Sequence, residues 1–174
     1  MKLLYSKEQI DERIAEVGAQ ISKDYKGREI FLVGVLKGCL VFMGQLLVKI
    51  EGKTSIDFMT VSSYGEGTES GDLRLVKDLD MPVKGKHVLL VEDIIDTGKT
   101  VDFVQNYLKE KGAASVEIVT FVEKKTRRHV DGLDPKYFCF EYDQPEFLVG
   151  YGFDLAEEYR NLPAVYRYEY DEEN

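Results

Sequence analysis

The sequence has few of the residue types that hold metals or build disulfide frameworks. It contains two cysteines, Cys39 and Cys139, and two histidines, His87 and His129. The cysteines fit no metal-binding spacing and each is flanked by apolar residues, so we expect buried, reduced thiols in a cytoplasmic protein. The histidines stand apart from the other candidate functional residues, and we assign neither a catalytic role.

Basic residues are in the minority, because 23 Lys and Arg face 32 Asp and Glu, which gives a net charge of −9. This balance argues against a general surface for nucleic acid or for an anionic membrane, so any phosphate site must be local. Long hydrophobic runs are missing too. The apolar part of the N-terminal MKLLYSKEQ is too short for a signal peptide, and no stretch reaches transmembrane length.

The 174 residues contain no internal repeat, no low-complexity segment and no linker long enough to separate domains. A hydrophobic content of 44% is ordinary for a globular chain and is sufficient for a substantial core. Length and composition therefore predict one domain that spans residues 1–174.

The most informative stretch runs from Val88 to Thr100 and reads VLLVEDIIDTGKT. Its first four residues are apolar enough for a strand buried on both faces. Three carboxylates and a small, hydroxyl-rich turn follow, and the turn opens a helical pattern with one apolar face, formed by Val101, Val104 and Leu108. Gly112 is expected to end this helix. Open α/β sheets bind ligands at the carboxyl ends of their strands, where a strand is followed by a helix, so we expect a binding site here.

The residue types in this stretch suggest the kind of ligand. The backbone N–H groups of residues 97–100, at a helix N-terminus, suit a phosphate. Glu92 and Asp93 would repel a phosphate, but they suit sugar hydroxyls or a hard cation such as Mg²⁺. Asp96 lies between the two groups and could act as an acid or a base. A ligand with a ribose between a phosphate and a cation satisfies all three.

The stretch allows two other interpretations. Gly98-Lys99-Thr100 suggests a nucleotide-triphosphate P-loop, but that motif requires a glycine where this chain has Asp93. The stretch could also be a buried strand with a solvated acidic end and no ligand.

Further strands and helices follow the same alternation. Ser6 and Gln9 form a capping-box start for an N-terminal helix with a stripe of isoleucine and valine. We expect strands over Glu29–Leu36, Ser55–Ser62, Asp72–Val76 and Ser115–Val122, a last strand from Val165, and a helix over Cys39–Ile50, and aromatic residues alternate over Tyr137–Tyr142. Four to five of the strands should form a mostly parallel sheet with helices on both faces.

The Val88–Thr100 string resembles the phosphoribosyl-pyrophosphate signature of the type I phosphoribosyltransferases. Its Glu-Asp-Ile-Ile-Asp-Thr-Gly-Lys-Thr form is similar to the hypoxanthine-guanine branch of that family, and the resemblance extends from about Phe31 to Tyr166. It implies a mostly parallel central α/β sheet flanked by helices, with a small hood formed mainly by about residues 125–174. It also implies transfer of a phosphoribosyl group from phosphoribosyl pyrophosphate to a 6-oxopurine base with release of pyrophosphate, Mg²⁺ as cofactor, and a homodimer or homotetramer.

The resemblance also implies a role for each site residue. Asp96 is the expected catalytic residue. Ribose and 5′-phosphate would contact Glu92, Asp93, Thr97, Gly98, Lys99 and Thr100, and pyrophosphate would contact Lys37, Gly38 and Arg160. The base would contact Lys124, Phe147, Leu148 and Asp154, the metal would bind near Glu92, Asp93 and Asp154, and Ser63 and Tyr64 would belong to a closing loop. In this family the peptide before Lys37 or its neighbour is often cis.

Alternatives to this assignment stay open at the level of sequence. Phe147 could be an ordinary core residue. Lys124 could be a solvated turn residue, with Lys125 or Arg127 recognising the base instead. A relative that binds RNA or DNA would need a basic face, which the net charge of −9 opposes. An enzyme for adenine, xanthine, orotate or uracil is another alternative, although a lysine ammonium favours an oxopurine over adenine because it donates to a carbonyl oxygen.

Overall fold

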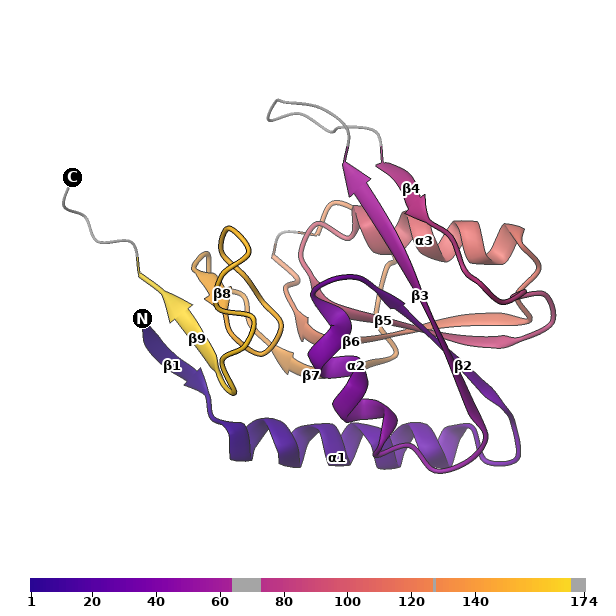
Figure 1. Cartoon of the computed structure of the whole chain (residues 1–174), viewed down its shortest axis with the longest axis horizontal. Coiled ribbons are helices and arrows are strands. Elements are labelled where there is room, and N and C mark those ends of the chain that lie inside the picture. Colours follow the sequence, from indigo (N-terminus) through magenta and orange to yellow (C-terminus); the bar gives the residue numbers. More distant parts are fainter. Residues whose placement is uncertain (64–72, 127, 170–174) are drawn as a thin grey trace.

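The computed structural model describes residues 1–63, 73–126 and 128–169 (Figure 1). Its main layer is a six-stranded sheet in the order β4 (Leu73–Lys77), β3 (Thr54–Ser63), β2 (Ile30–Val35), β5 (His87–Ile95), β6 (Ser115–Glu123) and β7 (Tyr137–Glu141). The five strands β3, β2, β5, β6 and β7 are parallel to one another. The strand β4 lies at the edge of the sheet and pairs antiparallel with β3. The predicted mostly parallel sheet is confirmed.

Helices cover both faces of this sheet (Figure 1). The helices α1 (Lys7–Asp24) and α2 (Cys39–Leu47) pack on one face, and α3 (Lys99–Glu110) packs on the other. The four residues Val88–Val91 of β5 are all 0% exposed, as expected for a central strand that is covered on both sides. Cys39 and Cys139 are buried free thiols, as predicted.

The start of α1 has the predicted capping box. Ser6 Oγ accepts from the backbone N–H of Gln9, and Gln9 Oε1 accepts from that of Ser6. The apolar stripe of α1 is buried against the sheet and α2, through Ile10, Ile14, Val17 and Ile21. This helix therefore contributes to the core.

A second, three-stranded antiparallel sheet lies beside the main one (Figure 1). Its strands have the order β1 (Lys2–Tyr5), β9 (Val165–Tyr168) and β8 (Phe147–Val149), so the first and last strands of the chain lie side by side. We call these three strands the hood sheet. The predicted hood range of about residues 125–174 also contains β7, which pairs with β6 in the main sheet. The division of the chain into core and hood stays a prediction.

Element boundaries differ from the predictions by a few residues. The helix α2 was expected to reach Ile50, but it ends at Leu47. Lys49 and Ile50 donate to Leu46 and Leu47, three residues back, so α-helical bonding gives way to a tight turn. Of the predicted returning strand, Asp72 lies outside the described residues, and the rest forms β4.

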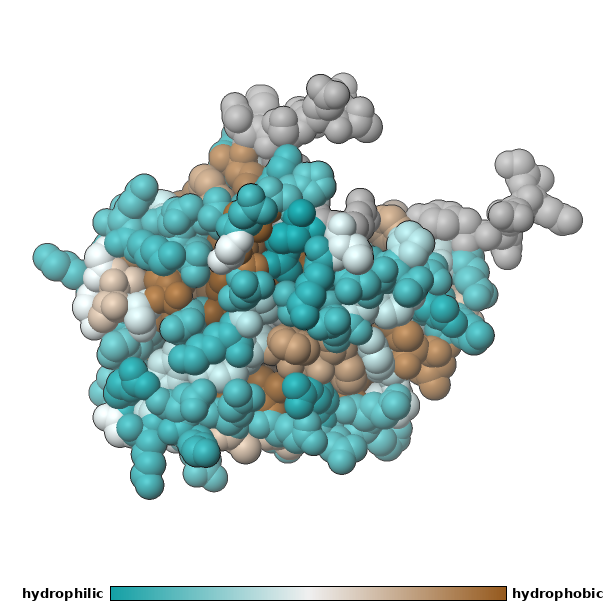
Figure 2. Space-filling model, turned by 180° about the vertical axis from the view of Figure 1, so that it is seen from behind, coloured by the Kyte–Doolittle hydropathy of each residue, from teal (hydrophilic) through white to brown (hydrophobic). Residues whose placement is uncertain are grey.

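Within the described residues, no helix is both long and apolar enough to cross a membrane. The back of the molecule is mostly hydrophilic, with hydrophobic side chains visible between the polar ones (Figure 2).

Candidate active site

The carboxyl ends of β2, β5 and β6 meet at one edge of the main sheet, because these strands are parallel and adjacent. Lys37 and Gly38 follow β2, Asp96 follows β5, and Lys124 follows β6. The peptide between Leu36 and Lys37 is cis. Loops that are distant in the sequence thus converge, as the predicted site requires.

Two glycines bring backbone and carboxylate close together at this edge. A Cβ at Gly38 would fall 1.8 Å from Oδ2 of Asp93, so the carboxylate occupies the space that any side chain would need. Gly152, with φ +100°, lies against the same loop, and a Cβ at Gly152 would be 2.5 Å from the Gly38 carbonyl oxygen. The loop after β8 therefore packs directly on the Lys37 loop.

The environment of Glu92 and Asp93 disfavours their charged forms. Glu92 is 8% exposed, and burial, followed by the charge of Asp93, raises the pKa of Glu92 well above its usual value. Burial also raises the pKa of Asp93 to about 6, although its hydrogen bond from the Ile94 N–H and the nearby Arg160 act in the opposite direction. Oε2 of Glu92 has no hydrogen-bond partner in the described part of the chain. Both carboxylates would gain from a hydroxyl donor or a cation.

The turn before α3 encloses a cavity of about 230 Å³. Thr97, Gly98 and Thr100 line it together with the end of β5, and Gly98 has φ +85°. The Lys99 side chain is exposed, so the contribution of Lys99 to an anion site would come from its backbone N–H. The geometry is a concave turn at a helix N-terminus, which can accept an anion.

A second cavity, of about 200 Å³, lies next to this turn and reaches the hood sheet. Lys124 is 4% exposed, and its Nζ lies 3.4 Å from the Glu146 carbonyl oxygen. Phe147 is 51% exposed at the rim, so its interpretation as an ordinary core residue is wrong, whereas Leu148 is 5% exposed. The lining residues are Asp93, Ile94, Asp96, Lys124, Pro145, Glu146, Phe147, Leu148, Phe153 and Asp154.

Lys125 points elsewhere. Its ammonium pairs with Glu141 at 2.6 Å, and its backbone N–H donates to Asp143. Arg127 and Tyr64 lie outside the described residues, and Ser63 is the last residue of β3. The closing loop therefore stays a prediction.

The two cationic side chains predicted to bind pyrophosphate, those of Lys37 and Arg160, both approach one carboxylate, Glu157, which the sequence did not reveal. Glu157 accepts from Lys37 Nζ at 2.9 Å and lies 3.6 Å from Nη2 of Arg160. Arg160 also pairs with Asp154 at 2.8 Å and donates to the Gly152 carbonyl at 2.7 Å. Glu157 sits on a loop with positive φ at several residues, and no sequence motif marked it. In this conformation Glu157 takes the place of an anion between the two cations.

The part of the chain that carries most of these residues matches a known protein family. The model of the phosphoribosyl transferase domain matches residues 3–155 of this chain. The chain belongs to the phosphoribosyltransferase family. A hypoxanthine-guanine phosphoribosyltransferase of Streptococcus mutans is 46% identical over 165 residues, which cover 94% of this chain and 91% of the relative.

Solved structures of phosphoribosyltransferases agree with this membership. A hypoxanthine phosphoribosyltransferase of Staphylococcus aureus superposes with a TM-score of 0.92 at 42% identity, covering 97% of this chain and 91% of the other. A hypoxanthine phosphoribosyltransferase variant of Trypanosoma cruzi, solved as a ternary substrate complex, gives a TM-score of 0.90 at 32% identity, covering 97% and 95%.

For a phosphoribosyltransferase, the predicted metal ligands need an additional partner. Among the described residues, no group of three or more His, Cys, Asp or Glu side chains is arranged to hold a metal ion. Asp154 is paired with Arg160, and Glu92 and Asp93 resist ionisation. Their oxygens are nevertheless the hard donors that Mg²⁺ prefers, and Mg²⁺ commonly binds to one or two carboxylates together with substrate phosphates. The residues fit a metal that arrives with the substrate.

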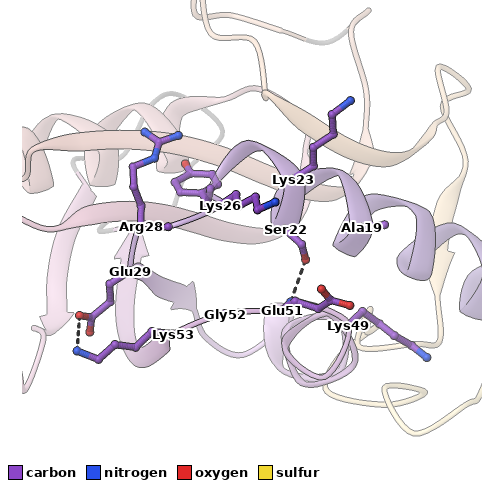
Figure 3. Close-up of a pocket in the computed structure, with 12 residues that line it drawn as sticks. Ala19, Ser22, Lys23, Lys26, Arg28, Glu29, Lys49, Glu51, Gly52 and Lys53 are labelled. Carbon is purple, nitrogen blue, oxygen red and sulfur yellow. Dashed lines mark hydrogen bonds and ion pairs between the residues drawn. The ribbon is translucent and has the colours of Figure 1, made fainter.

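A further cavity, of about 910 Å³, lies at the opposite edge of the sheet (Figure 3). Its cationic side chains do not converge on one point. Lys53 pairs with Glu29 at 2.8 Å, the guanidinium of Arg28 lies over the Tyr25 ring, and Figure 3 shows Lys49 pointing away. The C-terminal ends of α1 and α2 meet there, and their partial negative charge attracts lysines without any ligand. We therefore place the site at the other edge.

Proposed function

We propose that this phosphoribosyltransferase transfers a 5-phosphoribosyl group from phosphoribosyl pyrophosphate to a 6-oxopurine, hypoxanthine or guanine. The products are the nucleoside monophosphate and pyrophosphate, so the reaction is a purine salvage step. The observation that carries the proposal is that two cavities are adjacent. One is lined by Lys124, Asp96 and Phe147, and the other by the turn of residues 97–100, which we call the phosphate turn.

Each part of the site has a proposed task. Residues 97–100 bind the 5′-phosphate through backbone N–H groups and hydroxyls, which fixes the sugar. The ribose hydroxyls contact the carboxyl groups of Glu92 and Asp93, which precede the turn in the chain. Because Glu92 holds its proton more tightly than usual, it can donate to a hydroxyl as well as accept from one.

The base enters the neighbouring cavity. Lys124 donates to its 6-oxo oxygen, Phe147 stacks on the ring, and backbone groups near Leu148 contact its edge. Asp96 accepts a proton from the purine ring, and the loss of this proton makes the attacking ring nitrogen a better nucleophile towards C1′ of the ribose. The bond from C1′ to the diphosphate oxygen breaks as the bond to the base nitrogen forms.

Breaking this bond leaves positive charge on the sugar and negative charge on the leaving diphosphate, so electrostatic stabilisation is the main requirement. Lys37, the Gly38 backbone and Arg160 face the diphosphate once Glu157 has moved aside. Mg²⁺, held by Asp93, Glu92 or Asp154 together with the diphosphate, would supply further positive charge.

Other aspects are carried over from the family resemblance. They include a homodimer or homotetramer, with which the exposed Leu40 of α2 and the exposed Val48 directly after this helix are compatible, and a cytoplasmic location, which suits two reduced thiols. Light scattering would test the assembly.

The deciding experiment is a base panel. Hypoxanthine, guanine, xanthine, adenine, orotate and uracil are each offered with phosphoribosyl pyrophosphate and Mg²⁺, and nucleotide formation is measured. We expect turnover with hypoxanthine or guanine and little with adenine. Turnover confined to adenine or a pyrimidine would overturn the base assignment, and no turnover with any base would overturn the enzymatic proposal.

A further inference from the structure

The outer side of the phosphate turn is covered by the segment of residues 128–133. A Cβ at Gly98 would fall 2.7 Å from Cδ2 of Leu133 and 2.9 Å from Cδ of Arg128, so both side chains press against the turn. The backbone N–H of His129 donates to the Thr97 carbonyl at 2.9 Å. Arg128 and Leu133 line a separate cavity outside the turn, so they are placed to support the turn rather than to touch its ligand.

Arg128 is itself fixed by a nearly buried ion pair. Its Nη2 lies 3.2 Å from Oε1 of Glu123, and the two side chains are 12% and 2% exposed. Its Nη1 donates to the Leu133 carbonyl. A planar guanidinium can serve both acceptors at once while its aliphatic stem stays against Gly98. Removing one partner of such a pair would leave a buried charge uncompensated.

Glu123 connects this arrangement to the rest of the site. It is the last residue of β6, lies opposite Ile95 of β5, and is followed by Lys124. The Lys124 N–H donates to the Ile95 carbonyl at 3.0 Å. The ion pair therefore ties the turn to the strand end that carries the proposed base-binding lysine.

We propose that Arg128 and Glu123 are positioning residues for the 5′-phosphate of the phosphoribosyl donor. The identity of the ligand rests on the proposed function, whereas the support of the turn rests on the contacts above. Loosening the turn misplaces its N–H groups relative to the phosphate. A displacement of about 1 Å can cost up to ~10²-fold, and we expect a donor KM raised roughly tenfold. The KM for the base and kcat at saturating donor should stay near the wild-type values, because neither the Arg128 nor the Glu123 side chain lines the cavity proposed for the base.

The test compares Arg128→Lys and Glu123→Gln with a matched control. Lysine keeps the charge of Arg128 but cannot serve both acceptors, and glutamine keeps the shape of Glu123 without its charge. Arg13 is the control, because its guanidinium likewise bridges a carboxylate (Glu16) and backbone carbonyls (Phe138 and Cys139), between α1 and β7. Arg13→Lys should lower stability without changing donor KM.

Two readouts separate positioning from general destabilisation: the donor and base KM values, and the affinity for ribose 5-phosphate by calorimetry. We expect both site variants to lose donor and ribose 5-phosphate affinity by similar factors. The double variant should bind the donor no more weakly than the more impaired of the two single variants, because the pair acts as a unit.

A folded Arg128→Lys with wild-type donor KM would overturn the inference, as would an equal rise in donor KM for Arg13→Lys or an equal rise in base KM. If Arg128→Lys does not fold, Glu123→Gln decides by the same measurements. Absence of turnover in the wild type would instead refute the proposed function, and ribose 5-phosphate binding would still test the pair.

Discussion

Replacing Asp93 with asparagine should make the protein more stable at neutral pH. In the folded protein, burial raises the pKa of Asp93 from 3.8 to about 6. A shift of one pKa unit corresponds to about 1.4 kcal/mol, so a shift of about two units sets an upper limit of about 3 kcal/mol. Because the side chain is partly exposed, we expect about 1–2 kcal/mol.

The sign of this effect follows from linkage. A carboxyl whose pKa is raised by folding binds its proton more tightly in the folded state, so its contribution to stability is complete below pH 3.8 and is lost as the pH rises through about 6. Asparagine is uncharged at every pH and can still accept the hydrogen bond from Ile94. The gain for Asp93→Asn should therefore be present above pH 6 and vanish towards pH 4.

The assay is urea unfolding of wild type and Asp93→Asn between pH 4 and pH 8, with Glu12→Gln as control. Glu12 is exposed on α1, so its replacement changes the net charge alone. Transferase activity of Asp93→Asn should fall, since the carboxylate proposed to bind the ribose is lost. A variant that is less stable at pH 7.5, or whose gain is the same at pH 4 and pH 8, would refute the reasoning about burial.

Three further predictions concern the chemistry. Asp96→Asn should lower kcat by roughly 10²–10⁴-fold while ribose 5-phosphate still binds, and turnover near wild type would remove Asp96 from the mechanism. Lys124→Ala should lower kcat/KM for hypoxanthine and guanine by roughly ten- to a hundredfold and leave adenine unaffected, whereas Lys125→Ala should change none of them; the reverse pattern would mean that Lys125 contacts the base. Calorimetry should show weak Mg²⁺ binding without phosphoribosyl pyrophosphate and strong binding with it, and tight binding to the protein alone would contradict a metal that arrives with the substrate.

Much of the fold followed from local patterns. Covered strands must be apolar along their whole length, so Val88–Val91 marked the central strand directly. The capping box at Ser6 and the apolar stripe of α1 depend on residues three or four apart, which the sequence displays openly. The turn before α3 could be placed for the same reason.

Other features depend on residues that are far apart in the chain, and the sequence by itself could not fix them. The hood sheet joins β1 to β9, and no local pattern reports which strand a terminal segment will pair with. Phe147 was open to interpretation as a core residue, because an aromatic side chain in an apolar run looks the same whether a neighbouring element covers it or not. Its exposure was decided by the place of β8 in the hood sheet.

The local sequence determined the strand, the acids and the phosphate turn of this phosphoribosyltransferase, because each is a property of consecutive residues. Only the tertiary structure decided the electrostatics of the site. Asp93 is hard to ionise because Gly38, from another loop, leaves room for its carboxylate in a partly buried position. Likewise Glu157 reaches Lys37 only because Gly152 lets the loop after β8 pack on the loop after β2. Burial and charge proximity are distances in space, and folding alone sets them.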